Sequence, residues 1–226
     1  MTVPDEARGK IFERIRAALG AERLDRARRS AVQRRLERHP RGPLPARAKR
    51  QGEERVALFA SMLAKQGADV RRVATPKEAV GAVASYLGTC NLPPRVRMGR
   101  DRALAGLPWR EAWDIERAFG AAEPNDRASL SRAVAGAAET GTLFLLSGPD
   151  NPTSLNFLPE AHCVLIAVSD IFASYEEAFD RIRALSGGAL PRSVNLVSGP
   201  SRTADIEQTI VRGAHGPRRL LVVILG

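Results

Sequence analysis

Hydroxyl, guanidinium and carboxylate side chains are concentrated in one short stretch near the C-terminus, where residues 198–207 read Ser-Gly-Pro-Ser-Arg-Thr-Ala-Asp-Ile-Glu. Backbone N–H groups left free at the start of a helix, together with hydroxyls and a guanidinium, bind anions such as phosphates and carboxylates. A helix cap needs only two or three of these side chains, and a cap that binds no ligand is the alternative. The candidate ligand-binding residues of this stretch are Ser198, Gly199, Ser201, Arg202, Thr203 and Asp205.

The expected local structure of this stretch is a strand, a turn and a helix. The apolar run Val194–Val197 is typical of a buried strand, and the Gly-Pro pair at 199–200 ends it. Ser201 or Thr203 can then cap a helix from about Ala204 to Arg212. We expect the turn to lie at the carboxyl end of a strand, where open α/β sheets bind their ligands.

A carboxylate in the middle of the chain, Glu139, is the first candidate for catalysis. It precedes Thr140 and Gly141 at a predicted junction between a helix and a strand, and we include both neighbours among the candidate binding residues. A partly buried carboxylate at such a junction can act as an acid, a base or a nucleophile. Its alternative role is structural, either capping backbone amides or pairing with an arginine such as Arg202.

The second candidate for catalysis is His215, which lies between Gly213 and the Gly-Pro pair at 216–217. These neighbours predict an irregular loop before the last strand. An imidazole that titrates near neutral pH can transfer a proton in a pocket. The alternative is a structural hydrogen bond to the turn at 201–205, and the sequence does not choose between the two.

The residues that bind metals and cofactors are sparse in this chain. Its two cysteines, Cys90 and Cys163, cannot supply the four thiolates of an iron–sulfur cluster or a structural zinc site. His39 and His162 have no companions at the spacing of metal ligands, and no Gly-x-Gly-x-x-Gly fingerprint occurs. We therefore expect no metal site and no cofactor in this chain, so that any redox cofactor would belong to a partner protein.

Positive charge is concentrated at the N-terminus. Residues 1–55 carry 16 Lys and Arg against 8 Asp and Glu, a net charge of +8, whereas the whole chain carries +10. A basic helix attracts nucleic-acid phosphates, but Phe12 is the single aromatic residue of this segment and offers no platform for stacked bases. We expect a surface that binds a partner protein rather than nucleic acid. No apolar run reaches the length of a membrane span, and we expect a cytoplasmic protein.

Helical and strand patterns alternate along the chain. Helices are predicted at about 5–19, 21–38, 51–66, 77–87, 101–107, 125–138, 174–185 and 204–212. Strands are predicted at about 68–73, 95–98, 113–115, 142–146, 162–168, 194–197 and 220–225. This order predicts an α/β fold with a mostly parallel sheet and helices on both faces. We expect residues 1–48 to form a basic helical arm with a proline-rich linker, and residues 49–226 to form the α/β domain.

Two motifs resemble those of a known family. The stretch at 198–207, followed by Gly-Ala-His-Gly-Pro at 213–217, is similar to the C-terminal signature of the LUD-domain proteins of the lactate-utilisation protein C group. Ala-Glu-Thr-Gly-Thr at 138–142 resembles the entry to one of that family's strands. The resemblance covers the chain from about Gln51 to Gly226. It implies a fold of the NagB/RpiA/CoA-transferase kind.

The resemblance also implies a function. It predicts a subunit or accessory protein of an L-lactate-oxidising system that acts with iron–sulfur partner proteins and carries a cleft for a small anionic ligand. The alternative is a stand-alone enzyme of the isomerase or acyl/CoA-transfer type acting on a small phosphorylated or carboxylated metabolite. In that case Glu139 and His215 would act together in one cleft with the turn at 198–205.

Overall fold

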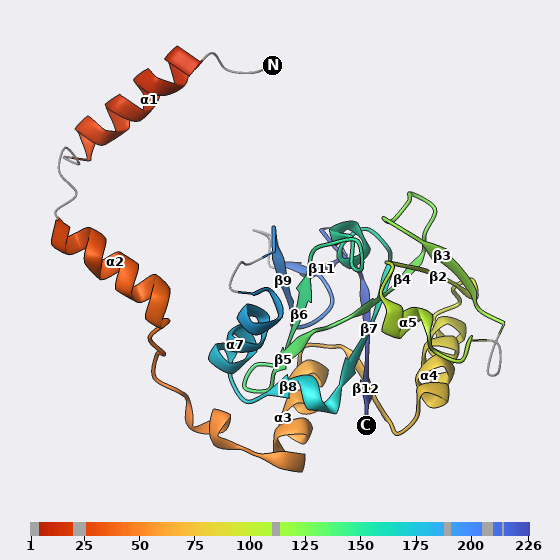
Figure 1. Ribbon diagram of the computed structural model, residues 1–226. Coiled ribbons are helices and arrows are strands. Elements are labelled where there is room, and N and C mark those ends of the chain that lie inside the picture. Colours follow the sequence, from red (N-terminus) through yellow and green to blue (C-terminus); the bar gives the residue numbers. More distant parts are fainter. Residues whose placement is uncertain (1–4, 20–25, 110–113, 188–190, 205–209, 214) are drawn as a thin grey trace. The chain divides into compact units, whose positions relative to one another are not determined.

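The computed structural model describes residues 5–19, 26–109, 114–187, 191–204, 210–213 and 215–226 (Figure 1). The chain separates into two compact units, Met1–Pro43 and Leu44–Gly226. From the sequence, we expected the arm with its proline-rich linker to extend to residue 48.

In its described residues the first unit has two helices, as predicted, α1 (Asp5–Ala18) and α2 (Arg26–Arg38). α2 has no buried residue. In α1 the ring of Phe12 lies between the guanidinium groups of Arg8 and Arg16, at 5.7 and 5.9 Å from its centroid. Apolar side chains on both helices are exposed, among them Ile11, Phe12, Ile15, Val32 and Leu36. Such thin apolar stripes do not form a core of their own.

A six-stranded parallel sheet forms the centre of the second unit. Its strands lie in the order β1 (Asp69–Val73), β12 (Arg219–Leu225), β7 (Ala161–Ala167), β4 (Ala128–Arg132), β2 (Arg95–Met98) and β3 (Glu116–Phe119). Every neighbouring pair is parallel. The near-continuous apolar runs of β7 and β12 are typical of strands that are covered on both faces, and both strands are almost entirely buried. The predicted fold class is thus confirmed.

Alternate residues of the central strands contact different layers. Cys163 and Leu165 pack in a core with α4 (Pro76–Thr89), which covers one face of the sheet. Val164 and Ile166 point to the other face and pack with α3 (Gly52–Lys65). Helices therefore contribute to both faces, as predicted. None of the helices in the described part of the chain is both long and apolar enough to cross a membrane.

A smaller mixed sheet shares the second face with α3. Its strands lie in the order β8 (Ile171–Phe172), β5 (Ala135–Ala137), β6 (Thr142–Leu146) and β9 (Val194–Val197). β6 is antiparallel to both of its neighbours. The helix α7 (Tyr175–Leu185) packs on β5 and β6 in a third core (Figure 1). Ser174 caps this helix by accepting a hydrogen bond from the backbone N–H of Glu177.

The predicted helix at 125–138 is wrong. This segment instead forms β4 and β5, which belong to different sheets. Alanine favours helices in isolation, but here the small residues permit a close approach of neighbouring layers. A Cβ atom on Gly136 would lie 2.8 Å from Cζ of Phe59 in α3. Packing with distant parts of the chain has overridden local propensity.

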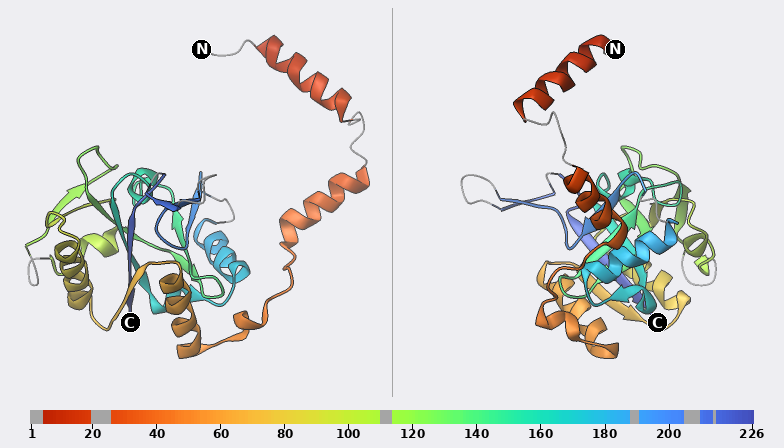
Figure 2. Two further views of the ribbon diagram at one scale, coloured as in Figure 1. Left: turned by 180° about the vertical axis from the view of Figure 1, so that it is seen from behind. Right: turned by 60° about the vertical axis from the view of Figure 1, so that its left-hand side comes forward.

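The predicted helix at 204–212 is also wrong in its described residues, 204 and 210–212, whereas residues 205–209 lie outside the described part of the chain. β10 (Arg202–Ala204) pairs antiparallel with β11 (Ile210–Arg212), and this hairpin extends away from the two sheets (Figure 2). β-branched residues such as Thr203, Ile210 and Val211 favour strands because their side chains have few rotamers in a helix. Smaller differences are that β3 begins at Glu116, not within 113–115, and that the helix predicted at 101–107 is the short α5 (Arg102–Ala105).

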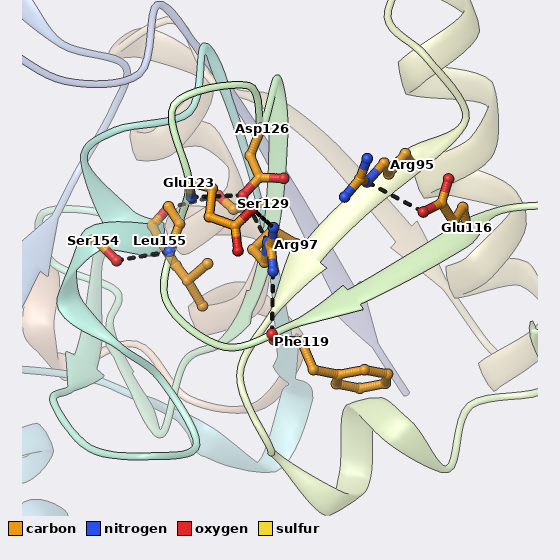
Figure 3. Close-up of polar contacts among 10 residues, drawn as sticks. Arg95, Arg97, Glu116, Phe119, Glu123, Asp126, Ser129, Ser154 and Leu155 are labelled. Carbon is orange, nitrogen blue, oxygen red and sulfur yellow. Dashed lines mark hydrogen bonds and ion pairs between the residues drawn. The ribbon is translucent and has the colours of Figure 1, made fainter.

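A buried ion pair joins the strands at one edge of the large sheet (Figure 3). Arg97 of β2 donates from Nε to Oδ2 of Asp126 at 2.7 Å, and these side chains are 7% and 3% exposed. Its Nη1 donates to the carbonyl oxygen of Phe119, at the end of β3. Its Nη2 lies 2.8 Å from Oε2 of Glu123. One guanidinium therefore holds β2, β3 and the loop that leads into β4.

Candidate ligand-binding site

The two C-terminal loops that the sequence singles out meet at one pocket of about 210 Å³, which we call the motif pocket. The backbone N–H of Ser201 donates to the carbonyl oxygen of Pro217 at 2.8 Å, and the N–H of Gly213 donates to that of Ser201 at 3.1 Å. These bonds close the hairpin and bring residues 198–201 beside residues 215–217. The motif pocket is lined by Asn156, Phe157, His162, Leu196, Val197, Ser198, Gly199, Pro200, Ser201, His215, Gly216, Pro217 and Leu220.

The inner wall of the motif pocket is formed by His162 and Asn156, which are each 1% exposed. Nε2 of His162 lies 3.0 Å from Oγ of Ser131 in β4. Ser131 in turn donates to Oδ1 of Asn156 at 3.3 Å. Because the single hydroxyl proton of Ser131 goes to Asn156, its oxygen accepts from His162 and Nε2 carries the imidazole proton. Two buried nitrogens, Nδ1 of His162 and Nδ2 of Asn156, have no partner within the described structure.

Burial keeps the His162 imidazole neutral, because it lowers the pKa of this side chain from its usual 6.5 to about 3. A neutral imidazole with its proton on Nε2 presents a lone pair at Nδ1. Among the side chains that line the motif pocket, His162 therefore has an unpaired hydrogen-bond acceptor at Nδ1, and Asn156 has an unpaired donor at Nδ2.

The pKa of His162 predicts how stability depends on pH. The pKa of His162 is lower in the folded chain than in the unfolded chain. Between these two pKa values the unfolded chain binds a proton at this side chain, whereas the folded chain does not. Stability is complete above about pH 6.5 and should fall on acidification, by about 2 kcal/mol between pH 7.5 and pH 5 from this residue alone. We expect urea unfolding of His162→Phe to lack this part of the pH dependence. His39→Gln is the matched control, since His39 is exposed, and equal pH dependence in all three proteins would contradict the prediction.

A chain of hydroxyl groups connects the two family-like motifs. Oγ1 of Thr142 lies 2.7 Å from Oγ of Ser198, 2.7 Å from the hydroxyl of Tyr175 and 2.8 Å from Oγ1 of Thr140. β6 and β9 are neighbours in the small sheet, which places Thr142 next to Ser198. Thr140 therefore lies in the polar network behind the motif pocket and does not line it.

Glu139 does not line the motif pocket. It is 6% exposed, and its Oε1 accepts a hydrogen bond from the backbone N–H of Tyr175 at 2.9 Å, at the start of α7. This is the structural role that the sequence left open as the alternative. Gly141 also has a packing role, because it has a φ of 66° and a Cβ atom there would lie 2.7 Å from the backbone nitrogen of Leu63.

The remaining candidate residues have different positions. Ser198, Gly199 and Ser201 line the motif pocket, and so does His215, whose side chain is exposed. Arg202 is exposed and does not line it, and its guanidinium lies against Gly67. The side chain of Thr203 and the whole of Asp205 lie outside the described residues.

The position of the motif pocket relative to the large sheet differs from the expected one. The turn at 198–201 follows β9 of the small sheet, and the pocket contacts His162 and Leu220, near the amino ends of β7 and β12. The prediction that this turn lies at a carboxyl end holds for β9 but not for the parallel sheet. A second pocket, of about 270 Å³, lies after the carboxyl ends of β2 and β4, where Arg132 Nε donates to Oδ2 of Asp101 at 2.8 Å.

His162 and Asn156 are functional candidates that the sequence does not reveal. His162 lies within an apolar run, where a structural role is the simpler interpretation, and Asn156 lies in the long loop at 147–159. Asn156 and Phe157 of that loop line the motif pocket. No cluster of three metal-ligating side chains occurs among the residues that the structure describes.

Comparison with protein families gives a match to the LUD domain over residues 87–225. The match includes the segment 138–142 and the two loops of the motif pocket. It begins within α4, so that α1, α2 and α3 lie outside it.

Curated relatives and a solved structure are also similar. An uncharacterized protein of Neisseria meningitidis serogroup B is 40% identical over 101 residues, 45% of this chain and 43% of that protein. Lactate utilization protein C of Shouchella clausii is 38% identical over 89 residues, 39% of each chain, and that of Halalkalibacterium halodurans is 33% identical over 119 residues, 51% of this chain and 52% of that protein. The chain thus aligns with about half or less of each relative. A crystal structure of a DUF162 family protein from Deinococcus radiodurans superposes with a TM-score of 0.56 and 25% identity, covering 81% of this chain and 100% of that chain.

Proposed function

Because the chain belongs to the LUD domain family, we propose that it is a subunit or accessory protein of an L-lactate utilisation system that acts with iron–sulfur partner proteins. The observation that carries the proposal is the similarity to relatives named lactate utilization protein C. The motif pocket supports it, because both loops of the C-terminal signature line one pocket of a size suited to a small metabolite.

The chemistry of lactate oxidation requires an electron acceptor. This chain has two cysteines, and burial raises the pKa of Cys163 to about 12, so that its thiol stays protonated. The iron–sulfur clusters are therefore assigned to partner proteins. The role of this chain would be to bind a small carboxylate in the motif pocket and to associate with those partners.

The partner contact is assigned to the first unit. α2 has arginines along its length and no buried residue, and exposed apolar side chains accompany them on α1 and α2. Arginines interleaved with apolar side chains are typical of protein–protein contacts.

The proposal is tested by removing the gene and by purifying the chain from cells grown on L-lactate. We expect loss of growth on L-lactate with unchanged growth on pyruvate, and a copurifying protein that contains iron and acid-labile sulfide. Reversing two charges on α2, Arg29→Glu with Arg35→Glu, should reduce recovery of that protein. The matched control is Lys77→Glu with Arg102→Glu, the same charge change on exposed residues of the α/β domain. Unchanged growth on L-lactate without the gene would contradict the proposal.

The alternative of a stand-alone isomerase or acyl-transfer enzyme requires Glu139 and His215 in one site. Glu139 is engaged at the start of α7 and lies outside the lining of the motif pocket, whereas His215 is part of it. No feature of the pocket favours this alternative.

A further inference from the structure

Two buried nitrogens with unused hydrogen-bonding capacity belong to side chains that line the motif pocket. Nδ1 of His162 and Nδ2 of Asn156 have no partner within the described structure, and both side chains line the pocket. A buried polar group without a partner costs about 1 to 3 kcal/mol of stability. Two such groups beside the same pocket indicate that a ligand or an ordered water supplies their missing hydrogen bonds.

The polarity of each nitrogen follows from its neighbours. The two hydrogen bonds that join His162 to Ser131 and Ser131 to Asn156 place the imidazole proton on Nε2, so that Nδ1 is an acceptor. Because Oδ1 of Asn156 accepts from Ser131, the amide group turns its NH₂ donor away from Ser131. The pair therefore offers one acceptor and one donor.

From this pair we infer that the motif pocket binds the hydroxyl group of a small hydroxy acid, with the hydroxyl donating to Nδ1 of His162 and accepting from Nδ2 of Asn156. A hydroxyl both donates and accepts, so it satisfies both nitrogens. A keto oxygen only accepts and would place its lone pair against that of Nδ1. A methylene group leaves both nitrogens without a partner.

The other lining residues fit the rest of such a ligand. The lining residues that the structure describes include no Lys, Arg, Asp or Glu, which disfavours a multiply charged phosphate ester. The hydroxyls of Ser198 and Ser201 can donate to a single carboxylate. The apolar side chains of Leu196, Val197 and Leu220 can pack against a short alkyl group. A 2-hydroxy monocarboxylate of the kind of L-lactate has all three parts, and this choice of ligand rests on the proposed function.

Binding of three acids by the full-length protein tests the inference. L-lactate, pyruvate and propionate share a carboxylate and a short carbon chain and differ at C2, which carries a hydroxyl, a keto oxygen or hydrogens. We expect titration calorimetry or ligand-observed NMR to show L-lactate binding at least about tenfold more tightly than propionate, and more tightly than pyruvate. Equal binding of L-lactate and propionate would overturn the inference and leave an ordered water as the partner of the two nitrogens.

Variants identify the residues responsible. His162→Phe removes both ring nitrogens, and Asn156→Leu removes the whole amide group. Each variant should abolish the preference for L-lactate. Ser129→Ala is the matched control, because Ser129 is a buried hydroxyl of the same strand as Ser131, bonds to the carbonyl oxygen of Leu155 and does not line the pocket. It should retain the preference. A preference that persists in both pocket variants would overturn the assignment of these residues.

A second measurement does not depend on how well the variants fold. In ¹⁵N-labelled wild-type protein, the Nδ1 resonance of His162 should shift on addition of L-lactate, because a hydrogen bond forms at its lone pair, and should not shift with propionate. An unshifted resonance at saturating L-lactate would also overturn the inference. The proposed function is judged separately, since loss of growth on L-lactate without the gene can occur whether or not this pocket binds the acid.

Discussion

Replacing Arg97 with alanine should lower the free energy of unfolding by about 3 to 5 kcal/mol. The guanidinium is buried and bonds to Asp126, which is 3% exposed, as well as to the carbonyl oxygen of Phe119 (Figure 3). Removing it leaves the Asp126 carboxylate buried without its cationic partner, and an uncompensated buried charge is more costly than the pair is favourable. Urea denaturation at neutral pH measures the effect.

The same strand provides the matched control. Arg95 lies two residues before Arg97 in β2 and forms an ion pair with Glu116 at 3.4 Å, and these side chains are 44% and 67% exposed. Arg95→Ala should change the free energy of unfolding by less than about 1 kcal/mol, because water screens exposed pairs. Similar losses in the two variants would show that the Arg97 network is not shielded from water in the way that the structure describes.

The sequence predicts the elements whose signals are local. β6 and β9 have the predicted bounds, and β7 and α7 lie within a residue of theirs. Continuous apolar runs specify the buried strands, and Ser174 specifies the start of α7. The expected cleft shared by Glu139, His215 and the turn at 198–205 is found only in part, because the two C-terminal loops meet at one pocket but Glu139 does not line it.

The features that the sequence does not predict depend on distant contacts. The segment that includes β4 and β5 is rich in alanine and serine, and its strands depend on distant partners: β4 pairs with β2 and β7, and α3 packs closely against Gly136 of β5. The inner wall of the motif pocket depends on the register of β4 and β7, which places Ser131 within reach of His162. Neither the register nor the unpartnered nitrogens leave a local signal. The position of Glu139 likewise depends on α7, a helix that begins 36 residues later in the chain.

Replacing Phe59 with alanine should lower the free energy of unfolding by about 3 to 5 kcal/mol. Phe59 is fully buried in α3, in the core shared with Val164 and Ile166 of the large sheet and Leu143 of the small sheet. Its removal opens a cavity where the helix and the two sheets meet, and strands on both sides limit how far that cavity can collapse. Ser61→Ala, on the exposed side of the same helix, should change stability by less than about 0.5 kcal/mol.

The contact between Phe59 and Gly136 gives this prediction a sharper form. A Cβ atom on Gly136 would lie 2.8 Å from Cζ of Phe59 and 2.9 Å from Cδ1 of Ile166, so Gly136→Ala should destabilise by about 1 to 3 kcal/mol through overpacking. Leucine at 59 lacks the distal ring atoms, and Phe59→Leu should relieve part of that clash. The double variant should therefore be more stable than the sum of the two single effects predicts, by at least about 0.5 kcal/mol in urea denaturation. Strict additivity would mean that α3 does not pack against β5 at this point, and the close approach that explains why an alanine-rich segment forms strands would lose its basis.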